Sequence, residues 1–349
     1  MVSKINFVDV SGLGNAGKSA ITDLLREIDG FYVPEYWFEF DILRVPRGLL
    51  DLRHCLLEDW SPIRSNAAYY EFIDVTEKMG LDPNPWNILG LINSTGQRYD
   101  RRFDGQFRSL SRQFADQLKV GSYKAEWSYD GLRENGIKRL LKRLMRRLGF
   151  RRSLFNDVIL LNGNGFDKKA KAYLDNLYRL IIPPSCDHVV FNNGFEPFNP
   201  EPGLEMLGAR QIAVIRDPRD IFVSGLNIYN ISDEDKHLLA FDNNGLSKSF
   251  LATDDLDAFV TRYRLYQEKL YSGINSHVLH VTYEKLILDY DAQIKKIFDF
   301  LDIDPARHQR ANTKFIPSES IKNIGLWKHY GRKDEIRFIE SHLNEYLFK

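Results

Sequence analysis

The sequence predicts an α/β protein of three layers, in which a mainly parallel sheet lies between two layers of helices. The chain opens with a strand-like run over residues 5–10, continues into a glycine-rich turn, and then enters a helix-like stretch over 20–28 with apolar side chains at helical spacing. Later apolar runs, 189–191 and 212–215, are typical of buried strands. Strands of this kind alternating with helices form layered α/β domains.

Composition supports a folded chain and excludes several classes of function. Of the 349 residues 43% are hydrophobic, which is ample for a packed core. Lys+Arg and Asp+Glu both number 48, so the formal net charge is zero and we expect no nucleic-acid partner. No apolar run is long enough to span a membrane, and the N-terminus lacks a signal-peptide pattern. The two cysteines, Cys55 and Cys186, fit a reducing compartment, so we expect a cytoplasmic protein.

We expect a single domain over residues 1–349, because no internal repeat and no low-complexity linker interrupts the chain. The middle of the chain, about residues 45–180, is interpreted as a helix-rich insertion or lid within that domain.

A phosphate-binding loop is the first functional motif. Gly12, Gly17, Lys18 and Ser19 complete the pattern Gly-x4-Gly-Lys-Ser, with a strand before it and a helix after it. Glycines let the backbone wrap around an oxyanion, the helix N-terminus adds positive potential, and Lys18 adds a mobile charge. A phosphate-like anion is therefore expected to contact the following residues of the loop: Gly14, Asn15, Ala16, Gly17, Lys18, Ser19 and Ala20.

The end of the run 212–215 carries a second anion-binding pattern. Arg216 begins the sequence Arg-Asp-Pro-Arg-Asp, and Ser224 follows about two helical turns later on the same side. An arginine and a serine hydroxyl can share one phosphate group. Asp217 and Asp220 are interpreted as helix caps and ion-pair partners.

The loop and the later Arg-to-Ser stretch, in this order, resemble the sulfotransferases that use 3′-phosphoadenosine 5′-phosphosulfate (PAPS). Residues 278–286 are similar to the strand and Tyr-Glu-x-Leu sequence of that family, and 294–301 to the helix that follows. Residues 318–330, with Gly-Leu-Trp-Lys, look like its C-terminal cofactor loop. The resemblance covers roughly residues 1–40 and 185–349.

This resemblance implies a fold like that of the P-loop nucleoside triphosphate hydrolases, with PAPS as the cofactor and adenosine 3′,5′-bisphosphate as its product. The N-terminal loop would hold the 5′-phosphosulfate, and Arg216 with Ser224 would hold the 3′-phosphate. Lys322 would complete the cofactor site from the C-terminal loop, and Trp327 would either stack on the adenine end of the cofactor or pack the loop. Lys18 would also act in catalysis by stabilising charge on the sulfuryl oxygens and the departing phosphate.

Two glutamates are the candidates for the catalytic base. The family members that act on hormones and phenols use a histidine on the strand before the arginine, but residues 192–194 are Asn, Asn and Gly here. The carbohydrate branch uses a glutamate on the second strand. Residues 31–39 offer that strand, with Glu35 as the first choice and Glu39 as the second.

The predicted reaction is in-line transfer of a sulfuryl group to a hydroxyl or amine of an acceptor, such as a carbohydrate or a small metabolite. A carboxylate takes the acceptor proton, and this scheme requires no metal.

One alternative is a Mg-ATP-dependent kinase that uses the same loop. It needs a magnesium carboxylate at the end of a buried strand near Ser19. Of the buried runs 158–161, 189–191 and 212–215, only the last leads to an aspartate, Asp217. The other alternative is a non-catalytic nucleotide-binding module, which predicts an intact loop with no carboxylate or histidine near the reacting group.

Residues 137–148 form an amphipathic segment with an apolar stripe on one side and cations on the other. We favour the interpretation that the stripe packs on the core and the basic face is solvated. The alternatives are an anionic acceptor, or a peripheral membrane contact through residues 137–152.

Overall fold

The computed structural model describes most of the chain, namely residues 5–35, 38–83, 92–125, 127, 129, 134, 136–150, 155–195, 198–228, 255–272 and 276–349. It divides into two compact units. The first comprises residues 1–41 and 182–349, and the second comprises 42–181. The prediction of one domain with a lid stays a prediction.

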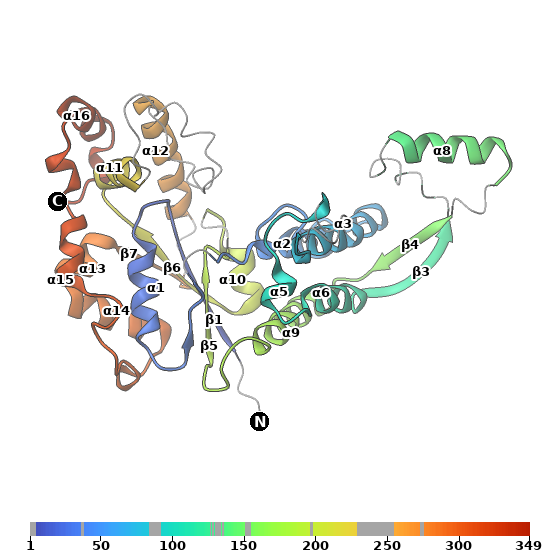
Figure 1. Ribbon diagram of the computed structural model, residues 1–349, viewed down its shortest axis with the longest axis horizontal. Coiled ribbons are helices and arrows are strands. Elements are labelled where there is room, and N and C mark those ends of the chain that lie inside the picture. The colour runs from blue at the N-terminus through green and yellow to red at the C-terminus, as the bar shows by residue number, and fades with distance from the viewer. Residues whose placement is uncertain are drawn as a thin grey trace. The chain divides into compact units, whose positions relative to one another are not determined.

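The first unit contains a sheet of five strands in the order β2-β5-β1-β6-β7, and every neighbouring pair is parallel (Figure 1). Its strands are β1 (Asn6–Gly12), β2 (Phe31–Tyr32), β5 (His188–Asn192), β6 (Arg210–Ile215) and β7 (Val278–Thr282). Val10 of β1 is in register with Asn192 on one side and Ile212 on the other. The segments that follow β1, β5 and β6 therefore leave the sheet at the same edge.

Helices cover both faces of this sheet. They are α1 (Lys18–Arg26), α10 (Glu201–Leu207), α11 (Pro218–Ile228), α12 (Leu256–Ser272), α13 (Tyr283–Leu288), α14 (Tyr290–Leu301), α15 (Pro317–Ser320) and α16 (Lys333–His342). On one face α1, α13 and α14 bury apolar side chains against alternate residues of the strands, such as Val8 and Val10 of β1. On the other face Phe7 stacks on Phe191 at 5.3 Å between ring centroids. The predicted three-layer α/β fold with a mainly parallel sheet is confirmed.

A second cluster of buried side chains joins α11, α12 and α16 to the loop that follows β1. Leu13 and Ala16 of the loop pack there with residues such as Phe222, Phe259 and Ile339. Apolar contacts with these helices therefore fix one side of the loop, and the opposite side is left to face a ligand.

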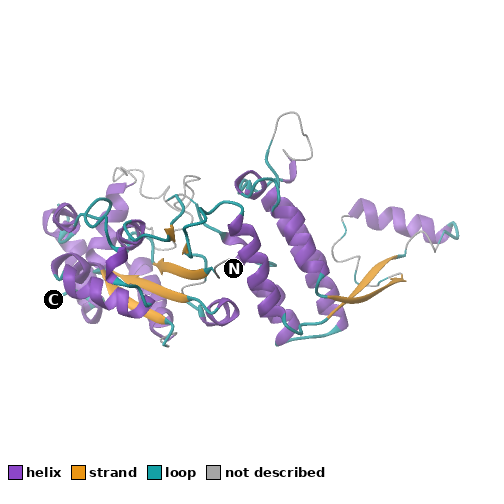
Figure 2. Ribbon diagram, turned by 90° about the horizontal axis from the view of Figure 1, so that it is seen from below, coloured by secondary structure: helices purple, strands orange, loops and turns teal. Residues whose placement is uncertain are grey.

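Over its described residues, the second unit is helical apart from one antiparallel pair of strands (Figure 2). Its elements are α2 (Leu49–Leu57), α3 (Pro62–Gly80), α5 (Tyr99–Arg102), α6 (Phe107–Asp116), β3 (Lys119–Ala125), α8 (Gly136–Arg147), β4 (Asn156–Leu161) and α9 (Phe166–Arg179). Aromatic side chains fill its interior, and Phe114 stacks on Tyr173 at 5.1 Å. None of the helices that the structure describes is long and apolar enough to cross a membrane.

The run 158–161 is a strand, as expected, and belongs to β4, which pairs with β3 in the second unit. Two expectations about individual elements are wrong. Among the described residues of the predicted strand 31–39, only Phe31–Tyr32 form a strand, because Pro34 has no N–H to donate to a sheet. The apolar stripe of 137–148 is not packed on a core, since α8 buries none of its residues. Residues 151 and 152, at the end of the suggested membrane contact, lie outside the described residues.

Candidate active site

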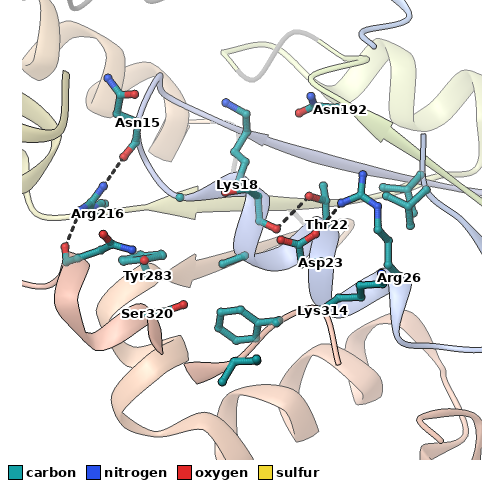
Figure 3. A pocket seen from close by; sticks show the side chains of 18 of the residues that line it. Asn15, Lys18, Thr22, Asp23, Arg26, Asn192, Arg216, Tyr283, Lys314 and Ser320 are labelled. Atoms are coloured by element: carbon teal, nitrogen blue, oxygen red, sulfur yellow. Dashed lines mark hydrogen bonds and ion pairs between the residues drawn. The ribbon is translucent and has the colours of Figure 1, made fainter. Parts of the chain in front are cut away.

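A cavity of about 750 Å³ opens at the carboxyl edge of the central sheet (Figure 3). Its walls come from the loop after β1, one face of α1, residues 33–35 and 39, the ends of β5 and β6, and the C-terminal segment 314–323. Ligand sites in proteins usually measure about 300–1,000 Å³, so this cavity is large enough for a nucleotide.

The loop after β1 has the backbone that an anion site requires. Gly17 has a left-handed φ of 90°, and a Cβ there would lie 2.3 Å from the ring of Tyr283, so only glycine fits. Gly17 precedes α1 without any side-chain cap, which leaves the positive end of the helix toward the cavity. Lys18 Nζ lies 3.3 Å from the carbonyl oxygen of Gly12 and 3.5 Å from that of Leu13.

Arg216 faces the same cavity from the end of β6, and only 4% of its surface is exposed. Its guanidinium donates to the carbonyl oxygens of Asn15 at 2.8 Å and Asn323 at 2.6 Å, and lies 4.8 Å from the ring centroid of Tyr283. Nε has no partner, and no carboxylate of the described chain lies within ion-pair distance. A buried cation without a counter-charge is costly, so this position favours a bound anion.

A network of buried groups fixes the turn that carries Arg216. The Oε1 atom of Glu284 accepts the N–H of Asp217 at 2.9 Å, which ties the end of β6 to the end of β7. Burial raises the pKa of Glu284 to about 7. The carboxylate of Asp217 accepts from Arg219 at 2.6 Å and from the N–H of Phe348 at 3.0 Å. Asp217 and Arg219 thus form a structural ion pair. This agrees with the interpretation of Asp217 as an ion-pair partner in the sequence.

Buried carboxylates hold both ends of the C-terminal segment that lines the cavity. Glu27, just past α1, accepts the N–H groups of residues 314 and 315 at 2.7 and 2.8 Å. Asp220, in the first turn of α11, accepts the N–H of Gly325 at 2.7 Å and that of Trp327 at 3.3 Å. Residues between these anchors are thereby presented to the cavity from the side opposite the loop.

Most of the site residues predicted from the sequence line this cavity: Asn15, Gly17, Lys18, Ser19, Ala20, Glu35, Glu39, Arg216, Ser224 and Lys322. Gly14, Ala16 and Trp327 are not among its lining residues. Ala16 is buried beneath the loop, and the indole of Trp327 lies 3.9 Å from the guanidinium carbon of Arg219.

The candidate bases reach the cavity from a loop. Glu35 is exposed and Glu39 is half-buried, and both follow the short strand β2. Among residues 192–194, Asn192 lines the cavity, whereas the N–H of Gly194 donates to the buried Asp9 at 2.7 Å.

Sequence reasoning missed several lining residues. Thr22 and Arg26 follow Lys18 at intervals of four, which places all three on one face of α1 (Figure 3). That spacing was the signal that could have revealed them. Asp23 also lines the cavity and pairs with Arg26 at 2.6 Å. Lys314 carries no comparable pattern, since its place depends on a distant contact of its backbone with Glu27.

The described residues contain no group of three or more His, Cys, Asp or Glu side chains arranged to hold a metal ion. The cationic side chains that line the cavity include Lys18 of the loop and the buried Arg216.

The fold and this cavity define the class of protein. A parallel sheet with β1 at its centre, followed by a Gly-x4-Gly-Lys-Ser loop and a helix, is the architecture of P-loop-like α/β proteins that bind phosphorylated ligands. Residues 203–325 match a protein-family model described as "Sulfotransferase domain". The matched segment includes Arg216, Ser224 and Lys322, and the resemblance of the chain to the sulfotransferases is confirmed. The match supports an enzyme of the sulfuryl-transfer class.

Three solved structures of sulfotransferases are similar to this chain, at low sequence identity. The sulfotransferase domain of the olefin synthase of Synechococcus PCC 7002 is 14% identical with a TM-score of 0.40, over 97% of this chain and 95% of that one. The sulfotransferase domain from the curacin biosynthetic pathway is 11% identical with a TM-score of 0.41, over 98% of each chain. Sulfotransferase STF9 from Mycobacterium avium is 13% identical with a TM-score of 0.36, over 100% of this chain and 78% of that one. No curated protein sequence matches the chain.

Proposed function

We propose that this chain transfers a sulfuryl group from PAPS to a hydroxyl or amine of an acceptor, such as a carbohydrate or a small metabolite. The observation that carries the proposal is that Lys18 and Arg216 line one cavity, and that Arg216 is buried there without a carboxylate partner among the described residues. Two cationic groups in one nucleotide-sized cavity fit a ligand that bears negative charge at both its 5′ and its 3′ position.

Each side of the cavity has a distinct task in this proposal. Arg216 and Ser224 bind the 3′-phosphate, because an arginine and a hydroxyl can share its oxygens. Lys18 and the N-terminus of α1 bind the 5′ end. Bound PAPS supplies the activated sulfuryl group. The cluster under the loop and the anchored C-terminal segment hold these groups still, so they need little rearrangement as charge develops.

The proton of the acceptor passes to a carboxylate of the loop after β2. The acceptor oxygen or nitrogen forms its bond to sulfur while the bond between sulfur and the phosphate oxygen breaks. Glu35 is the first candidate to receive the proton and Glu39 is the second, since both line the cavity. Lys18 stabilises the negative charge left on the departing phosphate.

The alternative functions fit less well. The only magnesium carboxylate suggested for a kinase was Asp217, which is occupied by Arg219 and Phe348 and is not among the lining residues of this cavity. A non-catalytic module is disfavoured by the presence of Glu35 and Glu39 in the lining.

Calorimetric titration tests the proposal against both alternatives. We expect adenosine 3′,5′-bisphosphate to bind in the presence of a chelator, and to bind more tightly than ATP with magnesium. A preference for ATP that requires magnesium would favour the kinase. Binding of the bisphosphate without mass gain of any compound in a broad acceptor screen would favour the non-catalytic module.

We further infer a cytoplasmic location. Both cysteines are free thiols, with Cys55 half-buried and Cys186 buried, which suits a reducing compartment.

A further inference from the structure

Helix α8 of the second unit segregates its side chains into two faces. Its twelve residues, Gly136–Arg147, include six Lys or Arg and no Asp or Glu. At roughly 100° per residue, the apolar side chains from Ile137 to Leu148 occupy about 140° of the circumference and the cations occupy the rest. A helix with this pattern normally buries its apolar face.

The apolar face of α8 is exposed to solvent. Ile137 is 74% exposed, Leu140 is 57% exposed and Leu148 is 71% exposed, and the helix buries no residue at all. In Figures 1 and 2 the helix stands clear of the other helices of its unit. Flanking residues add more exposed apolar surface, including Phe150 after the helix and Phe155 just before β4.

The cationic face is only partly neutralised within the chain. Glu134 pairs with Lys142 at 2.5 Å and lies 3.6 Å from Lys138. No carboxylate of the described residues lies within ion-pair distance of Arg139 or Arg143. The helix therefore offers two complementary surfaces side by side, one apolar and one positively charged.

We propose that α8 binds the surface of a membrane that contains anionic phospholipid and lies in the plane of the headgroups. Among the occupants considered, this one satisfies both faces at once. Acyl chains cover the apolar stripe while lipid phosphates meet the cations. An acidic polymer would neutralise the cations and leave the stripe in water, and a second α8 would cover the stripe but bring two cationic helices together.

Both faces are needed for stable binding. Cations near an anionic surface and apolar side chains buried among acyl chains each contribute only part of the binding free energy, which must also offset the cost of ordering. Binding should therefore require anionic lipid, weaken with salt and fail when either face is removed. The proposal does not depend on sulfuryl transfer.

Flotation of the full-length protein with lipid vesicles tests the proposal. We expect the protein to float with mixed phosphatidylcholine and phosphatidylglycerol vesicles, and at least about tenfold less with phosphatidylcholine alone. The double variant Leu140→Ser/Leu144→Ser keeps every charge and should lose flotation. Arg139→Glu/Arg143→Glu should lose it too. Lys295→Glu/Lys296→Glu makes the same charge change on the exposed face of α14 and should float like the wild type.

Several outcomes would overturn the membrane proposal. Flotation that survives Leu140→Ser/Leu144→Ser would show that charge alone attracts the protein. Absence of flotation together with a dimer that this double variant dissociates would assign the stripe to a second copy of the chain.

A fluorescent label provides a second test. The emission of a fluorophore attached to the thiol introduced by Leu144→Cys, in a chain that also carries Cys55→Ser, should shift to the blue only when anionic vesicles are added. A shift already present without vesicles would mean that the chain covers the stripe itself.

Discussion

Glu35 and Glu39 both line the cavity, and a single substitution distinguishes the base from a bystander. If Glu35 takes the acceptor proton, Glu35→Gln should lower kcat by about 10²–10⁴-fold while the affinity for adenosine 3′,5′-bisphosphate stays the same. Glu39→Gln is the matched control and should remain close to wild type. Steady-state rates with an acceptor from the mass-gain screen provide the measurement. If Glu39→Gln loses kcat and Glu35→Gln does not, Glu39 is the base. Two fully active variants would contradict a carboxylate base in this loop.

Lys18 is expected to act on the reacting group and not on the fold. It is half-buried at the start of α1, and Lys18→Ala should lower kcat by about 10²–10³-fold, as the loss of a charge-stabilising donor usually does. The free energy of unfolding, measured by thermal melts, should change by no more than about 0.5 kcal/mol, as for most substitutions outside the core. Lys328→Ala, in the turn before α16, is the control for loss of a lysine. A variant at position 18 with wild-type kcat would refute this role.

Glu284 makes the stability of the fold dependent on pH. Its carboxyl has a pKa of about 7 in the folded protein, against about 4.3 for a glutamate in an unfolded chain. Because the folded pKa is the higher one, stability is lost as pH rises from the unfolded value through the folded one. Glu284→Gln cannot ionise and keeps an oxygen for the N–H of Asp217. The variant should therefore gain Tm relative to wild type between about pH 5 and about pH 8.

Thermal melts across this range check that prediction, with Glu268→Gln on the exposed face of α12 as the control. A difference between Glu284→Gln and wild type that does not grow with pH would mean that Glu284 ionises normally in the fold.

At the scale of elements, the C-terminal segment forms one wall of the cavity only because its two ends are anchored. Asp220→Asn leaves one oxygen to accept the two N–H groups of Gly325 and Trp327, and should cost about 1–3 kcal/mol of stability. The released segment should raise KM for the sulfuryl donor more than it lowers kcat. Asp334→Asn on the exposed face of α16 is the control. A loss of stability with an unchanged KM would mean that the segment does not contribute to binding.

Elements whose signals are local were predictable from the sequence. The run 5–10, the loop and the stretch 20–28 correspond to β1, the loop and α1, because strand, turn and helix patterns there each depend on neighbouring residues. The Arg216 turn was found for the same reason. The part of the cavity wall at Lys314 was not predictable from the sequence, because its position depends on a hydrogen bond to Glu27, which is 287 residues away in the chain.

Two further elements show where sequence patterns fail. The resemblance to the carbohydrate branch suggested a strand over 31–39, but Pro34 interrupts the pairing and leaves Glu35 in a loop. The periodicity of 137–148 correctly indicated a helix, yet periodicity says only that one face is apolar. What covers that face depends on the rest of the molecule or on a partner.

At the scale of the whole molecule, one proposed ligand contacts two groups that are 198 positions apart in the chain, Lys18 and Arg216. They share a cavity because β6 is the neighbour of β1 in the parallel sheet, which brings the ends of both strands to one edge. The ligand should therefore stabilise the folded chain, by about 2.7 kcal/mol at a concentration of one hundred times Kd.

The most direct measurement of this claim is a calorimetric comparison of adenosine 3′,5′-bisphosphate with adenosine 5′-phosphate, which lacks only the 3′ group. The wild type should bind the bisphosphate at least about tenfold more tightly, since a charge-assisted contact of this kind contributes about 1.5–3 kcal/mol. Arg216→Ala should abolish that preference without changing the affinity for adenosine 5′-phosphate, and Arg216→Lys should retain part of it. If Arg216→Ala folds normally and still prefers the bisphosphate to the same degree, Arg216 does not hold the 3′-phosphate and the account is contradicted.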